Sequence, residues 1–403
     1  MIGLFEKAAT DLVPFLLVIT LIVTVHEAGH FMAARAFGVS VDRFSIGFGR
    51  AIAAWRDRAG TEWRIAWLPL GGYVRFAGDD NIASVPDQTD LAQMRAAIIA
   101  AEGPGAERKY LHFKPVWQRA LVVAAGPVAN FLLAILLFAV FFAVFGLQVT
   151  STRVFEVMPG SPAQQAGFQA GDRLTSADGH PVRSFEDLQF YVQFRQGVPI
   201  DIGLDRAGRP LHLIVRPEAV RESSPFGGSQ LVGRLGLLAR GGRTVRVDPA
   251  QAVELGVRKT WEVTSTTVYY LGRILSGQVS PLQLHSFVGM LHASGAVTHR
   301  AEIVAQQEQV SFVFAAAFFL LQLAAFISVS VGLLNLLPVP VLDGGHLLFY
   351  AYEGVARRPL AAGVQAAGYR AGLALLVGLM LFATFNDLRQ LRLFHSLFGS
   401  LFS

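Results

Sequence analysis

Four long apolar runs divide this sequence into membrane-like and polar parts. The runs cover residues 12–34, 116–146, 310–334 and about 366–385. At roughly 1.5 Å per helical residue, about 20 residues cross a hydrocarbon core of about 30 Å, so each run predicts a spanning helix. The expected fold class is an α-helical polytopic membrane protein with four spans.

The polar segment between the first two runs begins with a strand pattern. Residues 44–49 and 63–76 carry aromatic and β-branched residues between glycines, which is typical of short strands joined in a hairpin. Trp63, Ile65 and Trp67 alternate with less apolar residues, so one face suits either the headgroup level of a membrane or a small cytosolic hairpin. Residues 79–114 are polar, and we expect a flexible linker there.

A second polar segment, residues 150–245, has the pattern of a small β-rich domain. Strands are predicted at 154–158, 200–204 and 211–215, and short helices at 163–166 and 184–195. The following residues 246–309 are amphipathic, and we expect helices lying along the membrane face. The predicted organisation is therefore a membrane part at 1–149, the β-rich domain at 150–245, juxtamembrane helices at 246–309 and a second membrane part at 310–403.

Composition agrees with a membrane protein and restricts its chemistry. The chain is 53% hydrophobic with a mean hydropathy of +0.45, which is too apolar for an ordinary soluble protein of this size. The formal charge of +5 is spread among arginines rather than gathered in a block, so no nucleic-acid partner is expected. Cysteine is absent, which leaves histidine and carboxylate side chains as candidate metal ligands.

The first apolar run contains the motif His26-Glu27-Ala28-Gly29-His30. Two histidines four residues apart share one helix face and can bind one metal ion, while the glutamate beside them can take a proton from water. Ionisable side chains inside a membrane span are costly and functional by default, which favours a metal site over a solvated helix face. We therefore predict a zinc site within the membrane.

A third ligand is expected at the end of the third run, in Asn335-Leu-Leu-Pro-Val-Pro-Val-Leu-Asp-Gly-Gly-His346. Its prolines and glycines interrupt a helix at membrane depth, which is tolerated only where the backbone lines a site buried in protein. Asp343 is the carboxylate in this stretch and our choice of third ligand; a helix cap at Asp343 and ligation by His346 are the alternatives. Asn130, inside the second run, needs a polar partner, either on another helix or in the site.

Three further histidines, His285, His292 and His299, are spaced seven residues apart. On one helix they would be separated by about 10 Å, which is too far for a common metal ion. We interpret them as surface residues.

Together these motifs resemble the bacterial site-2 protease family of intramembrane zinc metalloproteases. The similarity rests on His26 to His30, on Ala125-Gly-Pro-Val-Ala-Asn130, on the stretch from Asn335 to Gly345, and on a PDZ-like string beginning Pro159-Gly-Ser-Pro. It implies that His26, His30 and Asp343 bind zinc and that Glu27 is the catalytic acid/base. It also implies a membrane-associated hairpin that guides substrate, and a substrate groove shaped by Asn335, Pro338 and Pro340.

The sequence departs from some members of this family in two places. It contains one PDZ-like segment where some members have two, and Ser286-Phe-Val-Gly289 stands where relatives usually have a Gly-Pro pair.

The resemblance also implies a function and a location. The expected enzyme is a zinc metalloendopeptidase of the bacterial inner membrane that cleaves the spans of single-span proteins, such as pre-trimmed anti-sigma factors and signal-peptide remnants. The arginine-rich loop between the first two runs favours a cytoplasmic active site, with the PDZ-like domain in the periplasm, where PDZ domains bind peptide ends. The alternatives are a membrane-anchored peptidase acting on soluble peptides, for which Glu302 and Glu308 are badly placed ligands, and a non-catalytic PDZ scaffold.

Overall fold

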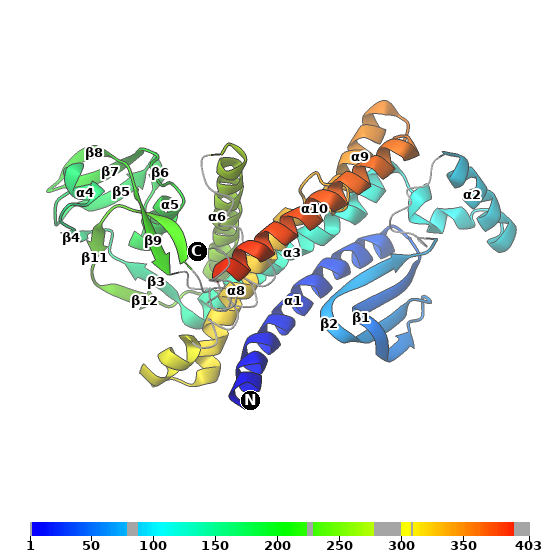
Figure 1. The fold of residues 1–403 in the computed structure, drawn as a ribbon, viewed down its shortest axis with the longest axis horizontal. Helices are drawn as coiled ribbons and strands as arrows, with labels where there is room; N and C mark the ends of the chain where they lie inside the picture. Colours follow the sequence, from blue (N-terminus) through cyan, green and yellow to red (C-terminus); the bar gives the residue numbers. More distant parts are fainter. Residues whose placement is uncertain (1, 79–87, 224–228, 278–299, 308, 391–403) are drawn as a thin grey trace, which may run out of the picture. The chain divides into compact units, whose positions relative to one another are not determined.

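The computed structural model describes residues 2–78, 88–223, 229–277, 300–307 and 309–390. The chain divides into two compact units, one formed by Met1–Leu137 with Leu284–Ser403 and the other by Phe138–Gln283. Figure 1 shows the long helices and the strand-rich region that make up these units.

Four helices contain segments long and apolar enough to cross a membrane: α1 (Ile2–Ala36), α3 (Val116–Phe145), α8 (Phe312–Asn335) and α10 (Ala362–Gln390). The candidate spans within them cover Leu12–Ala36, Val116–Phe145, Phe312–Asn335 and Ala362–Phe385. The predicted helical polytopic class is confirmed. The last span begins a few residues earlier than the hydrophobic run alone indicated.

Small residues allow α1, α3 and α8 to approach closely in the first unit. A Cβ atom added at Gly29 would lie 2.3 Å from the carbonyl oxygen of Ala125, so the α1 and α3 backbones nearly touch there. The hydroxyl of Ser328 in α8 donates to the carbonyl oxygen of Asn130 in α3 at 2.7 Å. These contacts bring α3 against both of its neighbours.

The predicted hairpin is confirmed, and it is longer and more strongly curled than expected. Strands β1 (Val41–Arg56) and β2 (Glu62–Phe76) pair along their length, and Phe44 pairs with both Val74 and Trp63. The hairpin thus folds back so that the first part of β1 lies between two parts of β2. Gly47, with φ +87°, adopts a backbone conformation available to glycine where this bend is made.

The expectation of a flexible linker over residues 79–114 was wrong for its described part. Residues 88–113 form α2 (Gln88–Glu102) and two short 3₁₀ helices, η1 (Ala106–Lys109) and η2 (Leu111–Phe113). Leu91, Met94 and Ile98 follow helical spacing, and Ile98 is buried. The polar composition of the segment concealed this sparse apolar stripe; residues 79–87 lie outside the described part.

The second unit contains the predicted strands and short helices. A four-stranded antiparallel sheet has the order β6-β5-β7-β8, and its buried residues Leu174, Ile200, Ile202 and Leu204 form the core with side chains of α5. The elements are β3 (Leu147–Thr150), β4 (Val154–Val157), α4 (Pro162–Gln165), β5 (Arg173–Ala177), β6 (His180–Pro181), α5 (Phe185–Gln193), β7 (Ile200–Arg206), β8 (Arg209–Val215), β9 (Glu218–Ser223), β10 (Ser229–Arg234), β11 (Leu237–Ala239) and β12 (Gly242–Val245).

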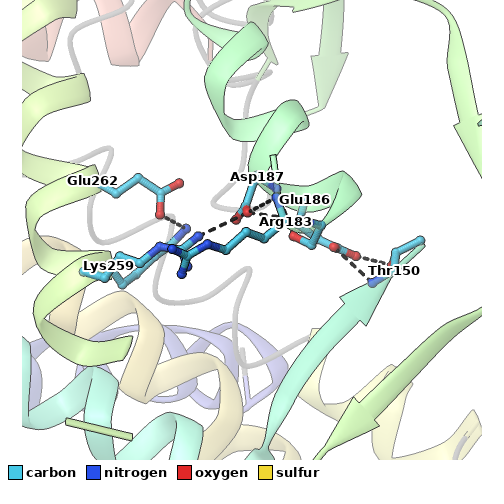
Figure 2. Close-up of polar contacts among 8 residues, drawn as sticks. Thr150, Arg183, Glu186, Asp187, Lys259 and Glu262 are labelled. Atoms are coloured by element: carbon cyan, nitrogen blue, oxygen red, sulfur yellow. Dashed lines mark hydrogen bonds and ion pairs between the residues drawn. The ribbon is translucent and has the colours of Figure 1, made fainter. Parts of the chain in front are cut away.

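Helix α6 (Pro249–Leu275) packs on this strand-rich region, a contact that its amphipathic pattern did not predict. The guanidinium group of Arg273 donates to the carbonyl oxygens of Phe194 and Gln196 at 2.7 and 3.1 Å. Asp187 at the start of α5 accepts from Arg258 at 3.1 Å, and Figure 2 shows its contacts beside the pairing of Glu186 with Thr150. The expected membrane-face position of residues 246–309 stays a prediction; His285, His292, His299 and residues 286–289 lie outside the described residues.

Candidate metal centre

The two histidines of α1 lie close together within the first unit. They lie one helical turn apart, and their Nε2 atoms are separated by 3.2 Å. Both residues are buried, with 7% of His26 and 9% of His30 exposed. Two protonated nitrogens at this distance would repel each other. The arrangement therefore suits two lone pairs directed at one cation.

Asp343 reaches the same point from the other end of the chain. It is the first residue of α9 (Asp343–Ala356), and its Oδ2 atom lies 3.1 Å from His26 Nε2 and 3.5 Å from His30 Nε2. The residue in the helix-cap position is Leu342, and no side chain makes a capping hydrogen bond there. The structure therefore gives Asp343 the place of a ligand rather than that of a helix cap.

These three donor atoms have the spacing that a zinc ion requires. With zinc bonds of about 2.0–2.2 Å, atoms at the corners of a tetrahedron are roughly 3.3–3.6 Å apart. The distances between donors here are 3.1, 3.2 and 3.5 Å, and Oδ2 of Asp343 is buried without any hydrogen-bond donor. A buried carboxylate oxygen in that state is explained by a cation, and the set of two imidazoles and one carboxylate suits zinc.

Helix α3 holds the second nitrogen of each imidazole ring. Nδ1 of His30 lies 2.9 Å from the carbonyl oxygen of Val122, which accepts its proton and leaves Nε2 free for metal. Nδ1 of His26 lies 3.2 Å from the amide nitrogen Nδ2 of Asn130, and Oδ1 of the same amide is buried without a partner. The amide orientation that turns Oδ1 toward this Nδ1–H satisfies both groups, so Asn130 contacts the site and also bridges α1 and α3.

Glycines keep side chains out of the space around the three donors. A Cβ atom at Gly126 would lie 2.3 Å from Nε2 of His30 and 2.9 Å from Cε1 of His26. Another at Gly345 would lie 2.4 Å from the backbone of Pro340 in the loop that precedes α9. The first glycine leaves room for the imidazole rings of His30 and His26, and the second lets the loop pass close to the start of α9.

Glu27 is held by the hairpin rather than by the helices. One of its carboxylate oxygens, Oε2, accepts a hydrogen bond from the backbone N–H of Val74 in β2 at 3.0 Å. This contact fixes the side chain beside the two histidines. A carboxylate in this position can accept a proton from a water molecule bound at the site.

Several other residues singled out by the sequence lie apart from this cluster. In the described part of the chain, the cluster of side chains that could hold a metal ion contains His26, His30 and Asp343 alone. His346 instead contacts the Tyr369 hydroxyl at 3.2 Å. Asn335 ends α8, while Pro338 is exposed and Pro340 packs against glycines of α10. The groove role of these three residues stays a prediction.

Two participants could not be recognised from side chains, because they are backbone groups. The carbonyl of Val122 and the N–H of Val74 are backbone groups that nearly every residue carries, so the identity of the residue gives no sign of their role. Gly126 did carry a signal, since a glycine inside an apolar spanning run is typical of a point where helices pack closely. The structure shows the close packing.

Comparison with known proteins places this geometry in context. Residues 14–379 match peptidase family M50. The chain is 50% identical to the metalloprotease MmpA of Caulobacter vibrioides over 97% of this chain and 98% of that protein. It is 41% identical to the provisionally named zinc metalloprotease Atu1380 of Agrobacterium fabrum, over 94% of this chain and 96% of that protein, and 39% identical to a similarly named protein, R01501, of Rhizobium meliloti.

Proposed function

The chain belongs to peptidase family M50 and is a multi-pass membrane zinc metalloprotease, and from this premise we propose that it cleaves single-span membrane proteins within their transmembrane segments. The observation that supports this substrate class is the position of the centre. His26, Glu27 and His30 all lie inside the candidate span Leu12–Ala36. A peptide bond that reaches them must be presented at membrane depth.

The residues divide the chemistry among themselves. His26, His30 and Asp343 would hold zinc, which acts as a Lewis acid and makes water nucleophilic near neutral pH. Glu27 accepts the proton of the attacking water and returns it to the leaving amide nitrogen. Val122 and Asn130 keep the imidazole rings in the orientation that this chemistry needs.

The hairpin and the loop before α9 are the proposed substrate guides. A helical substrate protects its own peptide bonds, so a segment must unwind before it reaches Glu27. The hairpin exposes large apolar side chains, including Ile52 at 66%, Trp55 at 51% and Trp67 at 74%, which supports its contact with lipid or with a substrate span. Asn335, Pro338 and Pro340 would then shape the groove beside Asp343.

The proposed location is the bacterial inner membrane, with the metal centre toward the cytoplasm. His26 and His30 lie late in the first span, Asp343 follows the end of the third span, and one return crossing separates these two spans. The strand-rich region follows the second span. That region would face the periplasm and bind peptide ends as a PDZ-like domain. In support, one edge of β11 pairs with β4. Among the described residues no strand pairs with the other edge of β11, which leaves that edge open for strand addition. Pre-trimmed anti-sigma factors and signal-peptide remnants are the expected substrates.

The substrate class is tested with a Glu27→Gln variant in liposomes. We expect the purified variant to retain zinc while losing cleavage of a single-span substrate, because an amide cannot accept the proton. His26→Ala, the matched ligand variant, should lose both zinc and cleavage. If the wild-type chain cleaved a soluble peptide of the same sequence at an equal rate, the anchored-peptidase alternative would be favoured. If the wild-type chain bound zinc but cleaved neither substrate, the scaffold would be favoured.

The orientation is tested by cysteine labelling, since the chain contains no cysteine of its own. Gln93→Cys in α2 should react only with cytoplasmic reagent, and Arg209→Cys at the start of β8 only with periplasmic reagent; both residues are exposed. The opposite pattern would reverse the proposed orientation.

A further inference from the structure

An ion pair in the first unit has no role in the mechanism above. Arg119 lies near the start of α3, and its Nη2 atom donates to Oε1 of Glu353 in α9 at 2.6 Å. The two side chains are largely buried, with exposures of 14% and 18%. Arg119 also lies over the ring of Tyr350, 4.9 Å from its centroid, and its Nε donates to the carbonyl oxygen of Lys114. The guanidinium group is therefore held by two side chains of α9 and by the backbone just before α3.

Arg119 shares a helix face with the groups that hold the histidines. Arg119, Val122, Gly126 and Asn130 follow one another at steps of three, four and four residues along α3. This spacing places them on one face of the helix. The last three contact or closely approach His30 or His26, as described above. The first one contacts α9 instead.

Helix α9 supplies the third zinc ligand and is a short rigid element. Its 14 residues extend about 21 Å. At its start, Gly344 and Gly345 lie against the backbone of the loop that ends α8. Glu353 follows Asp343 by ten residues, or about 15 Å along the axis, so the ion pair is a second, distant point of attachment. Two such points fix both the rotation and the axial position of the helix.

The position of α9 matters because metal binding tolerates little error. Zinc sites keep their ligand distances within about 0.2 Å, and a small rotation of α9 moves Oδ2 of Asp343 by more than this. We propose that Arg119 and Glu353 are positioning residues for the zinc site: their ion pair aligns Asp343 with the α3 face that holds His26 and His30. This inference rests on the proposed ligands and adds a device that sets their geometry.

A charged pair is well suited to this task. A buried ion pair contributes little net stability, but its direction and spacing are specific, and losing one partner leaves the other charge unpaired. An apolar contact between α3 and α9 would tolerate sliding. The pair instead permits one alignment.

The experiment measures zinc affinity in the purified full-length chain, by competition with a chelator after metal removal. Arg119→Gln and Glu353→Gln should each weaken zinc binding about 10- to 100-fold, as outer-shell changes do. The double variant should be little worse than either single one, because both remove the same interaction. The charge-reversed pair, Arg119→Glu with Glu353→Arg, should restore much of the loss.

Two further measurements separate positioning from general stability. The control Arg95→Gln breaks the ion pair of Arg95 with Glu107, elsewhere in the same unit, and should bind zinc as the wild type does. Cobalt substituted for zinc should give a wild-type absorption spectrum in Arg95→Gln and an altered one in Arg119→Gln, because the spectrum reports ligand geometry. If Arg119→Gln does not fold, Arg119→Lys, which keeps the charge but not the planar fork, is judged by the same criteria.

The outcomes are distinct. Wild-type zinc affinity and cobalt spectrum in the single variants, even with reduced thermal stability, would overturn the inference. Loss of zinc that the reversed pair does not restore would also overturn it. Retention of zinc by His26→Ala in the same assay would instead overturn the proposed ligands themselves, so the two failures are distinguishable.

Discussion

Two carboxylates show how differently the two units use polar groups. In the strand-rich unit, Asp172 accepts from Arg206 at 2.7 and 2.8 Å and from the backbone of Gln169 at 2.9 Å. In the helical unit, Oδ2 of Asp343 is buried beside two imidazole nitrogens and has no hydrogen-bond donor. The first carboxylate is satisfied by protein alone, whereas the second is placed where it could bind a cation together with the two histidines. Unsatisfied burial is therefore the more informative sign of function.

The same contrast extends to what stabilises each unit. The strand-rich unit has a core of interlocking aliphatic side chains, with Ile200 and Ile202 fully buried. In the helical unit, α1 and α3 pack closely at Gly29 beside the candidate metal centre. The geometry of the candidate metal centre thus depends on close contacts in which one added methyl group would clash. The stability of the strand-rich unit depends instead on its buried apolar area.

The largest expected effect is that of one added methyl group at the metal centre. Gly126→Ala would place a Cβ atom 2.3 Å from Nε2 of His30, so we expect loss of zinc binding and loss of proteolysis. Zinc content of the purified variant and cleavage of a single-span substrate measure this. Gly378→Ala in α10 is the matched control, since nothing lies within 4 Å of its added Cβ. Full zinc content in Gly126→Ala would refute the inference that zinc binding depends on the absence of a side chain at this position.

A core truncation in the other unit should cost stability without reaching the metal. Ile202→Ala removes a fully buried side chain, for which we expect a loss of about 2–5 kcal/mol in the local free energy of unfolding. Hydrogen exchange of the β5 and β7 amides in the full chain measures the loss. Zinc affinity should stay within about twofold of the wild type, because every proposed ligand lies in the helical unit. A parallel loss of zinc would show that the two units are coupled.

The smallest expected effect is a pH dependence in the strand-rich unit. Burial works to raise the pKa of Asp172, but the hydrogen bonds from Arg206 and Gln169 outweigh it, and the pKa lies below its usual value. A lowered pKa in the folded state stabilises the unit above the ordinary Asp pKa of about 4, and this contribution is lost as the pH falls further. Below about pH 4, wild-type protection of the β5 and β7 amides should approach that of Asp172→Asn.

The comparison at each pH removes the intrinsic effect of acid on exchange. The exposed Glu156→Gln serves as the control and should follow the wild type throughout. A difference between wild type and Asp172→Asn that stayed constant down to acid pH would contradict the assignment of this dependence to Asp172.

Much of the architecture could be predicted from the pattern of residues. Apolar runs of about 20 residues can be stable only as spanning helices in lipid, so four spans followed directly. The strands of the hairpin and of the β-rich segment followed from alternation and from glycine punctuation. Helix α2 was missed because its apolar residues are few, and the docking of α6 was missed because periodicity marks an apolar face without naming what covers it.

The sequence by itself determined the candidate chemistry of this protein: two histidines one turn apart in a span, a glutamate beside them, and a carboxylate at a broken helix. Those side chains are the donors that zinc prefers, whatever surrounds them. Only the tertiary structure decided that His30 and Asp343, 313 residues apart, lie 3.5 Å from one another, and that a carbonyl and a glycine of α3 complete the site. Such contacts join backbone groups and distant helices, and they depend on packing that no local pattern of residues encodes.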